Sequence, residues 1–241
     1  MFYGIDIGST TTKIIGMEER IEYRKILPTI EFIYSDYKEN FHDSVSTGYG
    51  RYSIKSKIAI PEIRAHVIGA VYQTGLKDFV LLDIGGQDFK IINVKNGFLD
   101  DFATNDKCAA GTGRFLEKMA GVLNVDINIL SRNYEDPVKI NSTCTVFAET
   151  ELVGLMMEKY PKERLMAGIN HAVYERIRPY IMKFRPKRIV FTGGVANNMA
   201  IARIIEEKSG IEVIVPDDPQ ANGAIGCAIY SKKIYQRSII P

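Results

Sequence analysis

The sequence of 241 residues contains few of the residues that mark several protein classes. It has three cysteines, three histidines and no tryptophan. Three cysteines are too few for a disulfide framework, so in a reducing compartment they are free thiols or metal ligands. The CxxC and HExxH motifs are absent. We interpret His42, His66 and His171 as ordinary surface or core residues, because none has a metal-type neighbour in the sequence.

Long apolar runs and blocks of like charge are also missing. No stretch approaches the length needed to span a bilayer, and the strand-like start, Met1 to Ile7, does not resemble a secretory signal. We therefore expect a cytoplasmic protein without membrane association. The net charge of +2, with no lysine/arginine block, gives no reason to expect nucleic acid. The length allows one large domain or two modest ones.

One short pattern occurs twice in the chain. Residues 6–15 and 83–92 both read Asp-Ile-Gly, four variable residues, then Lys-Ile-Ile. Each copy follows an apolar run and leads into a second one that ends in polar turn residues. Two apolar runs joined by a short Gly/Thr/Asp segment are typical of a β-hairpin. The sequence therefore predicts the same hairpin twice, about one small domain apart.

Such a hairpin is suited to phosphate binding. Glycine lets the backbone bring N–H groups close to an anion, and Ser9, Thr10 and Thr11 add hydroxyl donors. Asp6 and Asp83, at the strand ends, are of the type that holds Mg²⁺ through water. One copy alone would be interpreted as an ordinary tight hairpin. Two copies with matching aspartate, glycine and lysine positions favour a polyphosphate clamp.

The C-terminal third has a strand–glycine–helix pattern. A β-rich run, 188–191, precedes Thr192-Gly193-Gly194 and a helical stretch at 197–208. This unit allows a nucleotide base or ribose to approach the backbone, although a plain strand-to-helix loop explains it equally well. A strand at 211–215 and a small-residue helix at 221–230 follow. An apolar stripe on a long helix predicts core positions, namely Leu165, Ile169, Val173, Ile177 and Ile181.

Taken together, these motifs resemble the superfamily of acetate and sugar kinases, Hsp70 and actin (ASKHA). Within it the chain is most similar to activators of 2-hydroxyacyl-CoA dehydratases and the related BadF-BadG-BcrA-BcrD ATPases. Phe89 and Asn222 depart from the residue types usual in that family, and residues 17–45 look divergent. The resemblance covers the chain from near residue 1 to about 230, in segments 4–13, 47–51, 62–66, 83–88, 105–117, 144–149, 191–197 and 219–224.

The resemblance implies an α/β fold of two actin-like (ribonuclease H-like) domains with a nucleotide cleft between them. We expect residues 1–76, completed by 225–241, to form the first domain and 77–224 the second, with a hinge at 75–78. The resemblance also implies that the protein binds ATP or ADP with Mg²⁺. The residues it implies for this binding are Gly8, Ser9, Thr10, Thr11, Lys13, Gly85, Gly86, Gln87, Asp88, Gly193, Gly194 and Gly223.

For hydrolysis, Asp6 and Asp83 are the candidate Mg²⁺ residues, with Lys13 as a counter-charge for phosphate. Gln87, Asp88 or Glu62 could orient the attacking water. Each of these last three is equally explained as a solvated surface residue or a helix cap.

The family resemblance also implies a [4Fe–4S] cluster held between two subunits, one per dimer, by Cys108 and Cys144 of each. Such a cluster takes four thiolates, which three cysteines cannot supply but a symmetric dimer can. Each cysteine precedes a predicted helix, whose N-terminus would stabilise an anionic cluster. On spacing alone, both would be buried small hydrophobes, the interpretation retained for Cys227.

The expected function is then an ATP-dependent activator that delivers a low-potential electron to an iron–sulfur dehydratase or reductase. Its own electrons would come from a donor such as ferredoxin or flavodoxin. Two alternatives from other classes stay open: a small-molecule kinase without a cluster, and an actin-like filament or scaffold subunit. Within the favoured class, the partner could be a 2-hydroxyacyl-CoA dehydratase, an aryl-CoA reductase or another double-cubane-cluster reductase.

Overall fold

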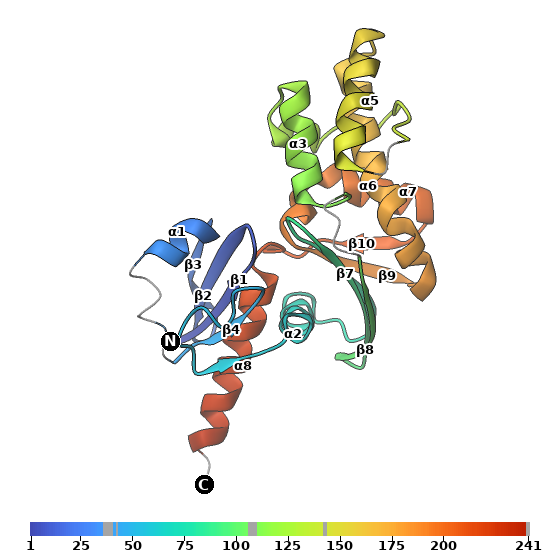
Figure 1. The fold of residues 1–241 in the computed structure, drawn as a ribbon. Helices are drawn as coiled ribbons and strands as arrows, with labels where there is room; N and C mark the ends of the chain where they lie inside the picture. Colours follow the sequence, from blue (N-terminus) through green and yellow to red (C-terminus); the bar gives the residue numbers. More distant parts are fainter. Residues whose placement is uncertain (36–40, 42, 106–109, 142–143, 240–241) are drawn as a thin grey trace. The chain divides into compact units, whose positions relative to one another are not determined.

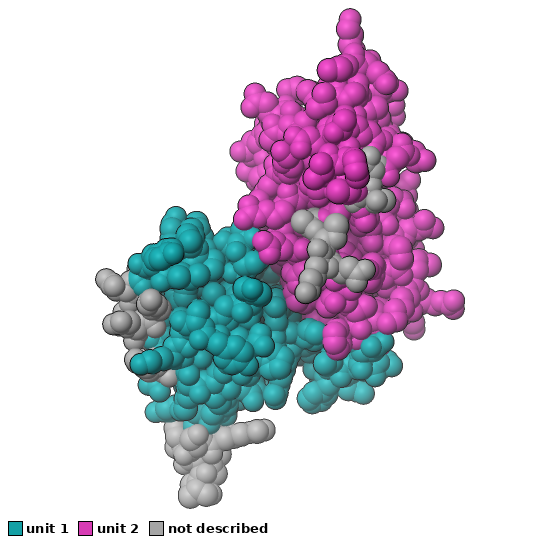
Figure 2. Space-filling view, in the orientation of Figure 1, with its two compact units in different colours: residues 1–78, 94–101, 216–241 teal, residues 79–93, 102–215 magenta. Residues whose placement is uncertain are grey.

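The computed structural model describes residues 1–35, 41, 43–105, 110–141 and 144–239 (Figure 1). The chain divides into two compact units (Figure 2). Unit 1 comprises 1–78, 94–101 and 216–241, and unit 2 comprises 79–93 and 102–215. Within the described ranges, none of the helices combines the length and apolar character that crossing a bilayer requires.

The sheet of unit 1 has five strands in the order β3-β2-β1-β4-β5. The central strand β1 pairs antiparallel with β2 and parallel with β4. Successive β1 side chains alternate between the two faces of the sheet, so Ile5 and Ile7 share one face while Gly4 and Asp6 share the other. The strands are β1 (Phe2–Ile7), β2 (Thr11–Met17), β3 (Ile21–Pro28), β4 (Val45–Thr47) and β5 (Ile58–Ala59).

Helices cover both faces of this sheet. The short α1 (Thr29–Tyr34) places Phe32 against Ile5, Ile7 and their neighbours. On the other face, α8 (Asn222–Ile239) packs on β1 and β2, with Ala224, Ile225 and Ala228 buried against Ile15 and Met17. The helix α2 (Glu62–Thr74) lies beside α8. Thus Asp6 points toward the helical layer formed by α2 and α8.

The contact between α2 and α8 is close because glycines replace side chains at the crossing. A Cβ added at Gly226 of α8 would lie 1.9 Å from the Ala65 carbonyl oxygen of α2. A Cβ at Gly69 of α2 would lie 2.1 Å from the Asn222 carbonyl oxygen. Both obstacles are backbone atoms, which cannot turn aside as a side chain can. The position of the α8 N-terminus over β1 therefore depends on these glycines.

Unit 2 repeats this sheet strand for strand. Its order, β10-β9-β6-β7-β8, becomes that of the first sheet when read from the other edge. The central strand β6 pairs parallel with β9, as β1 does with β4. The duplicated pattern in the sequence therefore corresponds to a duplicated sheet. The strands are β6 (Phe79–Ile84), β7 (Phe89–Lys95), β8 (Phe98–Thr104), β9 (Arg188–Thr192) and β10 (Glu212–Ile214).

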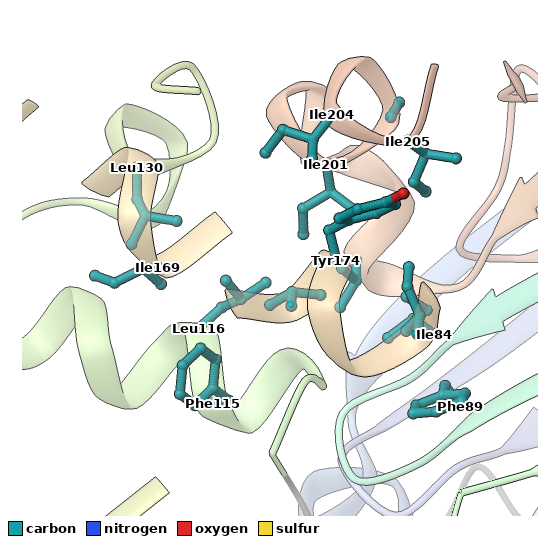
Figure 3. Packing of buried hydrophobic residues seen from close by; sticks show 14 of the residues in the cluster. Ile84, Phe89, Phe115, Leu116, Leu130, Ile169, Tyr174, Ile201, Ile204 and Ile205 are labelled. Carbon is teal, nitrogen blue, oxygen red and sulfur yellow. The ribbon is translucent and has the colours of Figure 1, made fainter. Parts of the chain in front are cut away.

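The helices of unit 2 enclose one large apolar cluster, part of which is drawn in Figure 3. The predicted stripe of the long helix is confirmed as core, since its five residues are at most 1% exposed. That helix continues through Pro179. The elements are α3 (Gly113–Leu123), α4 (Ile127–Leu130), α5 (Thr145–Met157), α6 (Lys162–Phe184), the short 3₁₀ helix η2 (Gly194–Asn197) and α7 (Met199–Ser209).

Two helix limits differ from the sequence prediction. The helix expected around 150–159 begins at Thr145, so Cys144 is its N-cap residue. The last helix runs to Ile239 instead of Tyr230. Compared with the predicted domain limits, the grouping also places 77–78, 94–101 and 216–224 in unit 1. The division into two functional domains stays a prediction.

The substitution Gly226→Ala tests the close contact between α2 and α8. The added methyl group meets the backbone of Ala65, so we expect the free energy of unfolding to fall by about 1–3 kcal/mol, as for other overpacked sites. Urea unfolding followed by circular dichroism measures this change. As the control, Gly121→Ala in α3 places its methyl group in open space, and it should raise stability by about 0.5–1 kcal/mol. Equal effects of the two substitutions would contradict the packing argument.

Candidate functional site

The β1–β2 turn of unit 1 is a tight turn fastened to the start of α1. The Gly8 N–H donates to the Thr11 carbonyl oxygen at 3.1 Å, which closes the turn. The Thr29 hydroxyl donates to the Gly8 carbonyl oxygen at 2.7 Å, and the Thr29 N–H donates to the Thr10 carbonyl oxygen at 3.0 Å. The Ser9 side chain is exposed. The turn is thus held in place, with Ser9 facing solvent.

Asp6 lies at the end of β1 with its carboxylate almost fully buried, at 3% exposure. It is directly opposite Lys13 on β2, and Lys13 Nζ lies 3.3 Å from Asp6 Oδ2. Among the described residues, the other oxygen, Oδ1, has no hydrogen-bond partner, and neither does Thr10 Oγ1. Buried polar atoms of this kind normally bind something, and carboxylate oxygens suit a hydrated Mg²⁺. The donor set therefore fits the predicted metal role of Asp6.

The β6–β7 turn of unit 2 is closed by the same backbone hydrogen bond. The Gly85 N–H donates to the Asp88 carbonyl oxygen at 2.9 Å. Asp83, also 3% exposed, accepts a hydrogen bond of 2.9 Å from the Thr192 hydroxyl. Lys90 Nζ lies 2.8 Å from Asp88 Oδ2. Gln87 and Asp88 are exposed at the tip of this turn.

A third repeated feature, a Thr-Gly pair, follows the strand parallel to each central strand. Gly48 and Gly193 have nearly equal positive φ angles, 87° and 88°. A Cβ at Gly48 would lie 2.6 Å from the Ile7 carbonyl oxygen, and one at Gly193 would lie 2.3 Å from that of Ile84. Only glycine allows this close approach in that conformation. The sequence repeat omitted this pair, although Thr-Gly directly after an apolar strand was its signal.

The β6–β7 turn, called the second turn below, and the residue after it, Phe89, are hydrogen-bonded to residues on both sides of 106–109. On one side, the Phe89 N–H donates to Asn105 Oδ1 at 2.9 Å. On the other, the Gly113 N–H donates to the Gly85 carbonyl oxygen at 2.9 Å. The Arg114 N–H and the Thr112 hydroxyl both donate to Gly86 O, at 2.9 and 2.8 Å. Cys108 itself lies outside the described residues.

The two described cysteines have opposite environments. Cys144 is the N-cap residue of α5, is partly exposed, and accepts at its carbonyl oxygen from the Ala148 N–H at 2.8 Å. Cys227 of α8 is fully buried. Its burial, with the nearby Asp6 carboxylate, raises the pKa of the Cys227 thiol well above its usual value. Cys227 therefore stays protonated, and the structural role predicted for it agrees with this environment.

The start of α2 adds a histidine that the sequence reasoning did not include. Glu62 is the first residue of α2, and His66 follows one turn later with its ring buried. His66 Nε2 lies 3.8 Å from Glu62 Oε1. A Cβ at Gly223, in the first turn of α8, would lie 2.9 Å from His66 Nε2 and 3.2 Å from Asp6 Oδ2. The i,i+4 spacing of Glu62 and His66 was the available signal.

Unit 1 thus brings together Asp6, Lys13, Glu62 and Gly223 with the β1–β2 turn, and His66 joins them. In unit 2, the second turn lies next to the start of α3, and Thr192 ties Asp83 to the beginning of the Gly193–Gly194 segment. Gly194 is exposed at the start of η2. The predicted nucleotide-binding residues therefore fall into two groups, each of which is built by one unit.

Comparison with known proteins agrees with this geometry. A family model described as the BadF/BadG/BcrA/BcrD ATPase family matches residues 35–231. The 2-hydroxyisocaproyl-CoA dehydratase activator of Clostridioides difficile is 38% identical over 95% of this chain and 93% of its own. The (R)-2-hydroxyglutaryl-CoA dehydratase activating ATPase of Acidaminococcus fermentans is 36% identical over 95% and 96%.

Solved structures extend the agreement to the fold. The activator of the 2-hydroxyisocaproyl-CoA dehydratase from Clostridium difficile, with bound ADPNP, superposes with a TM-score of 0.89 at 34% identity. The match covers 100% of this chain and 98% of that one. It confirms the predicted α/β fold with two actin-like sheets. With its two turns, its Thr-Gly pairs and a match over most of its length, the chain belongs to the BadF/BadG/BcrA/BcrD ATPase family.

Proposed function

We propose that the protein is an ATP-dependent electron-transfer activator. It works as a homodimer in which Cys108 and Cys144 of both protomers hold one [4Fe–4S] cluster. ATP binding and hydrolysis drive a low-potential electron into a partner iron–sulfur enzyme, such as a 2-hydroxyacyl-CoA dehydratase. A ferredoxin or flavodoxin supplies the electron. The names of the relatives, activators of such dehydratases, support this class of partner.

The observation that carries the proposal is the set of bonds between the second turn and its neighbours. Residues 85–88 form the predicted phosphate-binding turn, and two of them, Gly85 and Gly86, are bonded to the beginning of α3. Asn105, before the Cys108 segment, is bonded to Phe89, the residue that follows the turn. A nucleotide that shifts this turn must therefore shift the residues flanking Cys108, because backbone bonds connect them. Such a shift is the mechanical link that coupling between ATP and an electron requires.

The residues that would bind ATP come from the two groups described above, one in each unit. Asp6 and Asp83 would hold Mg²⁺, which neutralises phosphate charge when bound, and Lys13 adds a positive charge. The two turns supply backbone N–H groups and the hydroxyls of Ser9, Thr10 and Thr11 to the phosphates. Gly193, Gly194 and Gly223 would lie along the rest of the nucleotide, with Gly193 fixing the backbone before the exposed Gly194. Glu62, Gln87 and Asp88 are the candidates that orient water.

The surroundings of Cys144 support a cluster shared by two protomers. The thiol is partly exposed at a helix N-terminus, where N–H groups favour an anionic group. Along α5, the side chains of Val146, Phe147, Val153 and Met157 are exposed. An apolar helix surface of this kind marks a protein contact. A second protomer that supplies its own cysteines would cover this surface and complete the four thiolates of the cluster, which provides one-electron redox chemistry when bound.

The first test of this proposal is the metal content of cysteine variants purified without oxygen. We expect Cys144→Ala and Cys108→Ala to abolish the iron and to weaken the dimer, because each removes two of the four thiolates. Cys227→Ala is the matched control and should keep its iron, since that thiol is buried and protonated. Iron analysis and sedimentation measure both effects. Full iron in the Cys144 and Cys108 variants would refute the cluster site, and a colourless wild-type protein that phosphorylates a metabolite would favour a kinase.

The second test concerns the two buried carboxylates. Asp6→Asn and Asp83→Asn keep the side-chain shape but remove the charge that holds Mg²⁺, so we expect ATP turnover to fall by about 100-fold or more. Iron content should not change, because neither residue lies in a cysteine segment. The control Asp126→Asn exchanges one good N-cap of α4 for another and should leave both quantities unchanged. Turnover within twofold of the wild type would remove that aspartate from the metal site.

The third test addresses the bond between Thr112 and the second turn. Thr112→Val removes one hydrogen bond to the Gly86 carbonyl oxygen. Loss of about 1 kcal/mol corresponds to about a fivefold change in a two-state equilibrium. The quantity to measure is the factor by which MgATP changes the rate of iron removal by a chelator. We expect this factor to be about fivefold smaller in Thr112→Val than in the wild type, while ATP turnover stays near the wild-type value.

The matched control for this test is Thr74→Val, which removes a hydroxyl-to-carbonyl bond of 2.7 Å at the end of α2. It should leave the response to MgATP unchanged. If Thr112→Val responds to MgATP as the wild type does, the bond to Gly86 does not transmit the nucleotide state.

A further inference from the structure

The loop that follows β4 carries an arginine, Arg51, that is not among the residues predicted from the sequence to bind ATP. β4 lies parallel to β1, so both strands finish at the same end of the sheet, where ligands of α/β proteins commonly bind. The Gly50 N–H of the loop donates to the Ile7 carbonyl oxygen at 2.9 Å. A Cβ at Gly48 would lie 2.6 Å from Asp6 Oδ1. The loop is therefore fastened to the end of β1, from which the β1–β2 turn begins.

The Arg51 side chain is held within this loop by two contacts. Its Nη1 donates to the Gly48 carbonyl oxygen at 3.2 Å, and its guanidinium carbon lies 4.7 Å from the centre of the Tyr52 ring. The backbone is fixed as well, since the Arg51 carbonyl oxygen accepts from the buried Ser46 hydroxyl at 2.9 Å. Gly48 thus contacts both the Asp6 carboxylate and the Arg51 guanidinium.

The edge of this guanidinium formed by Nε and Nη2 has no acceptor among the described residues. Arg24 of the same unit shows what such an edge can do, because its Nε and Nη2 bind the two oxygens of Asp218 at 2.6 and 3.0 Å. A planar pair of donors of this kind matches two oxygens of a carboxylate or a phosphate. In Arg51 the pair is therefore open to a ligand with that geometry.

The lysines of the two turns already face carboxylates. Lys13 Nζ lies 3.3 Å from Asp6 Oδ2, and Lys90 Nζ lies 2.8 Å from Asp88 Oδ2. Each of these positive charges is therefore partly offset within the protein. Arg51 forms no ion pair with any residue in the part of the chain that the structure describes, so its full charge can act on a phosphate.

The corresponding loop of unit 2 lacks this charge. Gly193 matches Gly48 in its φ angle and in its close approach to the central strand. Three positions after Gly193 the chain has Ala196, which is fully buried, where unit 1 has Arg51. Residues 194–197 include no charged side chain. The duplication has therefore produced two loops in equivalent places, and the loop of unit 1 is the one that can bind an anion through a cation.

We infer that Arg51 binds the terminal phosphate of ATP through Nε and Nη2. The terminal phosphate has three free oxygens and the largest negative charge of the three phosphates, so it suits a two-donor guanidinium best. Arg51 then distinguishes ATP from ADP. The inference rests on the proposed function only in that the protein must bind ATP.

The experiment compares the binding of ADP with that of ADPNP, an ATP analogue that is not hydrolysed, both with Mg²⁺. Titration calorimetry gives the two Kd values, and the ratio of Kd for ADP to Kd for ADPNP measures the contribution of the terminal phosphate. We expect this ratio to fall about 10- to 100-fold in Arg51→Gln, which loses a charged hydrogen-bonding group. Arg51→Lys keeps the charge without the planar pair of donors, so its ratio should fall less, about 3- to 10-fold.

The matched control is Arg64→Gln in α2. The Arg64 guanidinium also lies 4.7 Å from the centre of a tyrosine ring, that of Tyr230 in α8, so this variant removes the same kind of stacked cation from the same unit. Its ratio should stay within about twofold of the wild type. An equal fall in Arg64→Gln and Arg51→Gln would show a general effect of net charge and overturn the inference.

The outcomes separate this inference from the proposed function. A wild-type protein that binds neither nucleotide contradicts the proposed function, whatever Arg51 does. Where the wild type binds both, an unchanged ratio in Arg51→Gln overturns the role of Arg51 alone. Equal weakening of ADP and ADPNP also leaves the ratio unchanged, as expected if Arg51 only supports the loop, and overturns it too. If Arg51→Gln fails to fold, Arg51→Lys decides, and a wild-type ratio in that variant overturns the inference.

Discussion

The structure depends most on a buried aspartate at the end of each central strand. Removing a carboxylate from water costs several kcal/mol unless partners replace the water. Asp6 and Asp83 are each 3% exposed, so each needs partners supplied by the fold. Their strands are central in their sheets, which places each carboxylate beside a tight glycine turn. The sheet order, the turns and the packing of α8 can all be understood as the structure that keeps these two groups buried.

In each copy a side chain from a neighbouring strand contacts the buried aspartate. Asp6 faces Lys13 across the β1–β2 pair, and Asp83 accepts from the Thr192 hydroxyl on the neighbouring parallel strand. One oxygen of Asp6 still has no hydrogen-bond partner among the described residues. The duplicated backbone thus places a buried carboxylate beside a glycine turn in both units, and in unit 1 one carboxylate oxygen remains available to a cation.

The sequence predicted the parts of the fold that local patterns determine. Both hairpins, the Arg188 strand and the stripe on α6 followed from apolar periodicity over short windows. The start of α5 was misplaced by five residues because Cys144 is not a usual N-cap residue and its side chain makes no capping bond. The contact of His66 with Asn222 could not be seen from its neighbours in sequence, since Asn222 lies 156 residues away. Asn222 was noted only as a departure from the usual residue type, whereas the structure shows its amide bonded to the His66 carbonyl oxygen and to Gln73.

Backbone contacts also decide which parts of the site can move independently. In unit 2, the turn and the start of α3 share bonds at Gly85 and Gly86, and a Cβ at Gly113 would lie only 3.2 Å from Gly86 Cα. In unit 1, the glycines at the crossing of α2 and α8 bring the backbones closer still, since an added Cβ would lie 1.9 or 2.1 Å from a carbonyl oxygen. Packed backbones of this kind shift together, since no side chain between them can absorb a displacement. A ligand at the β6–β7 turn therefore acts on the whole helix α3, which follows the segment containing Cys108.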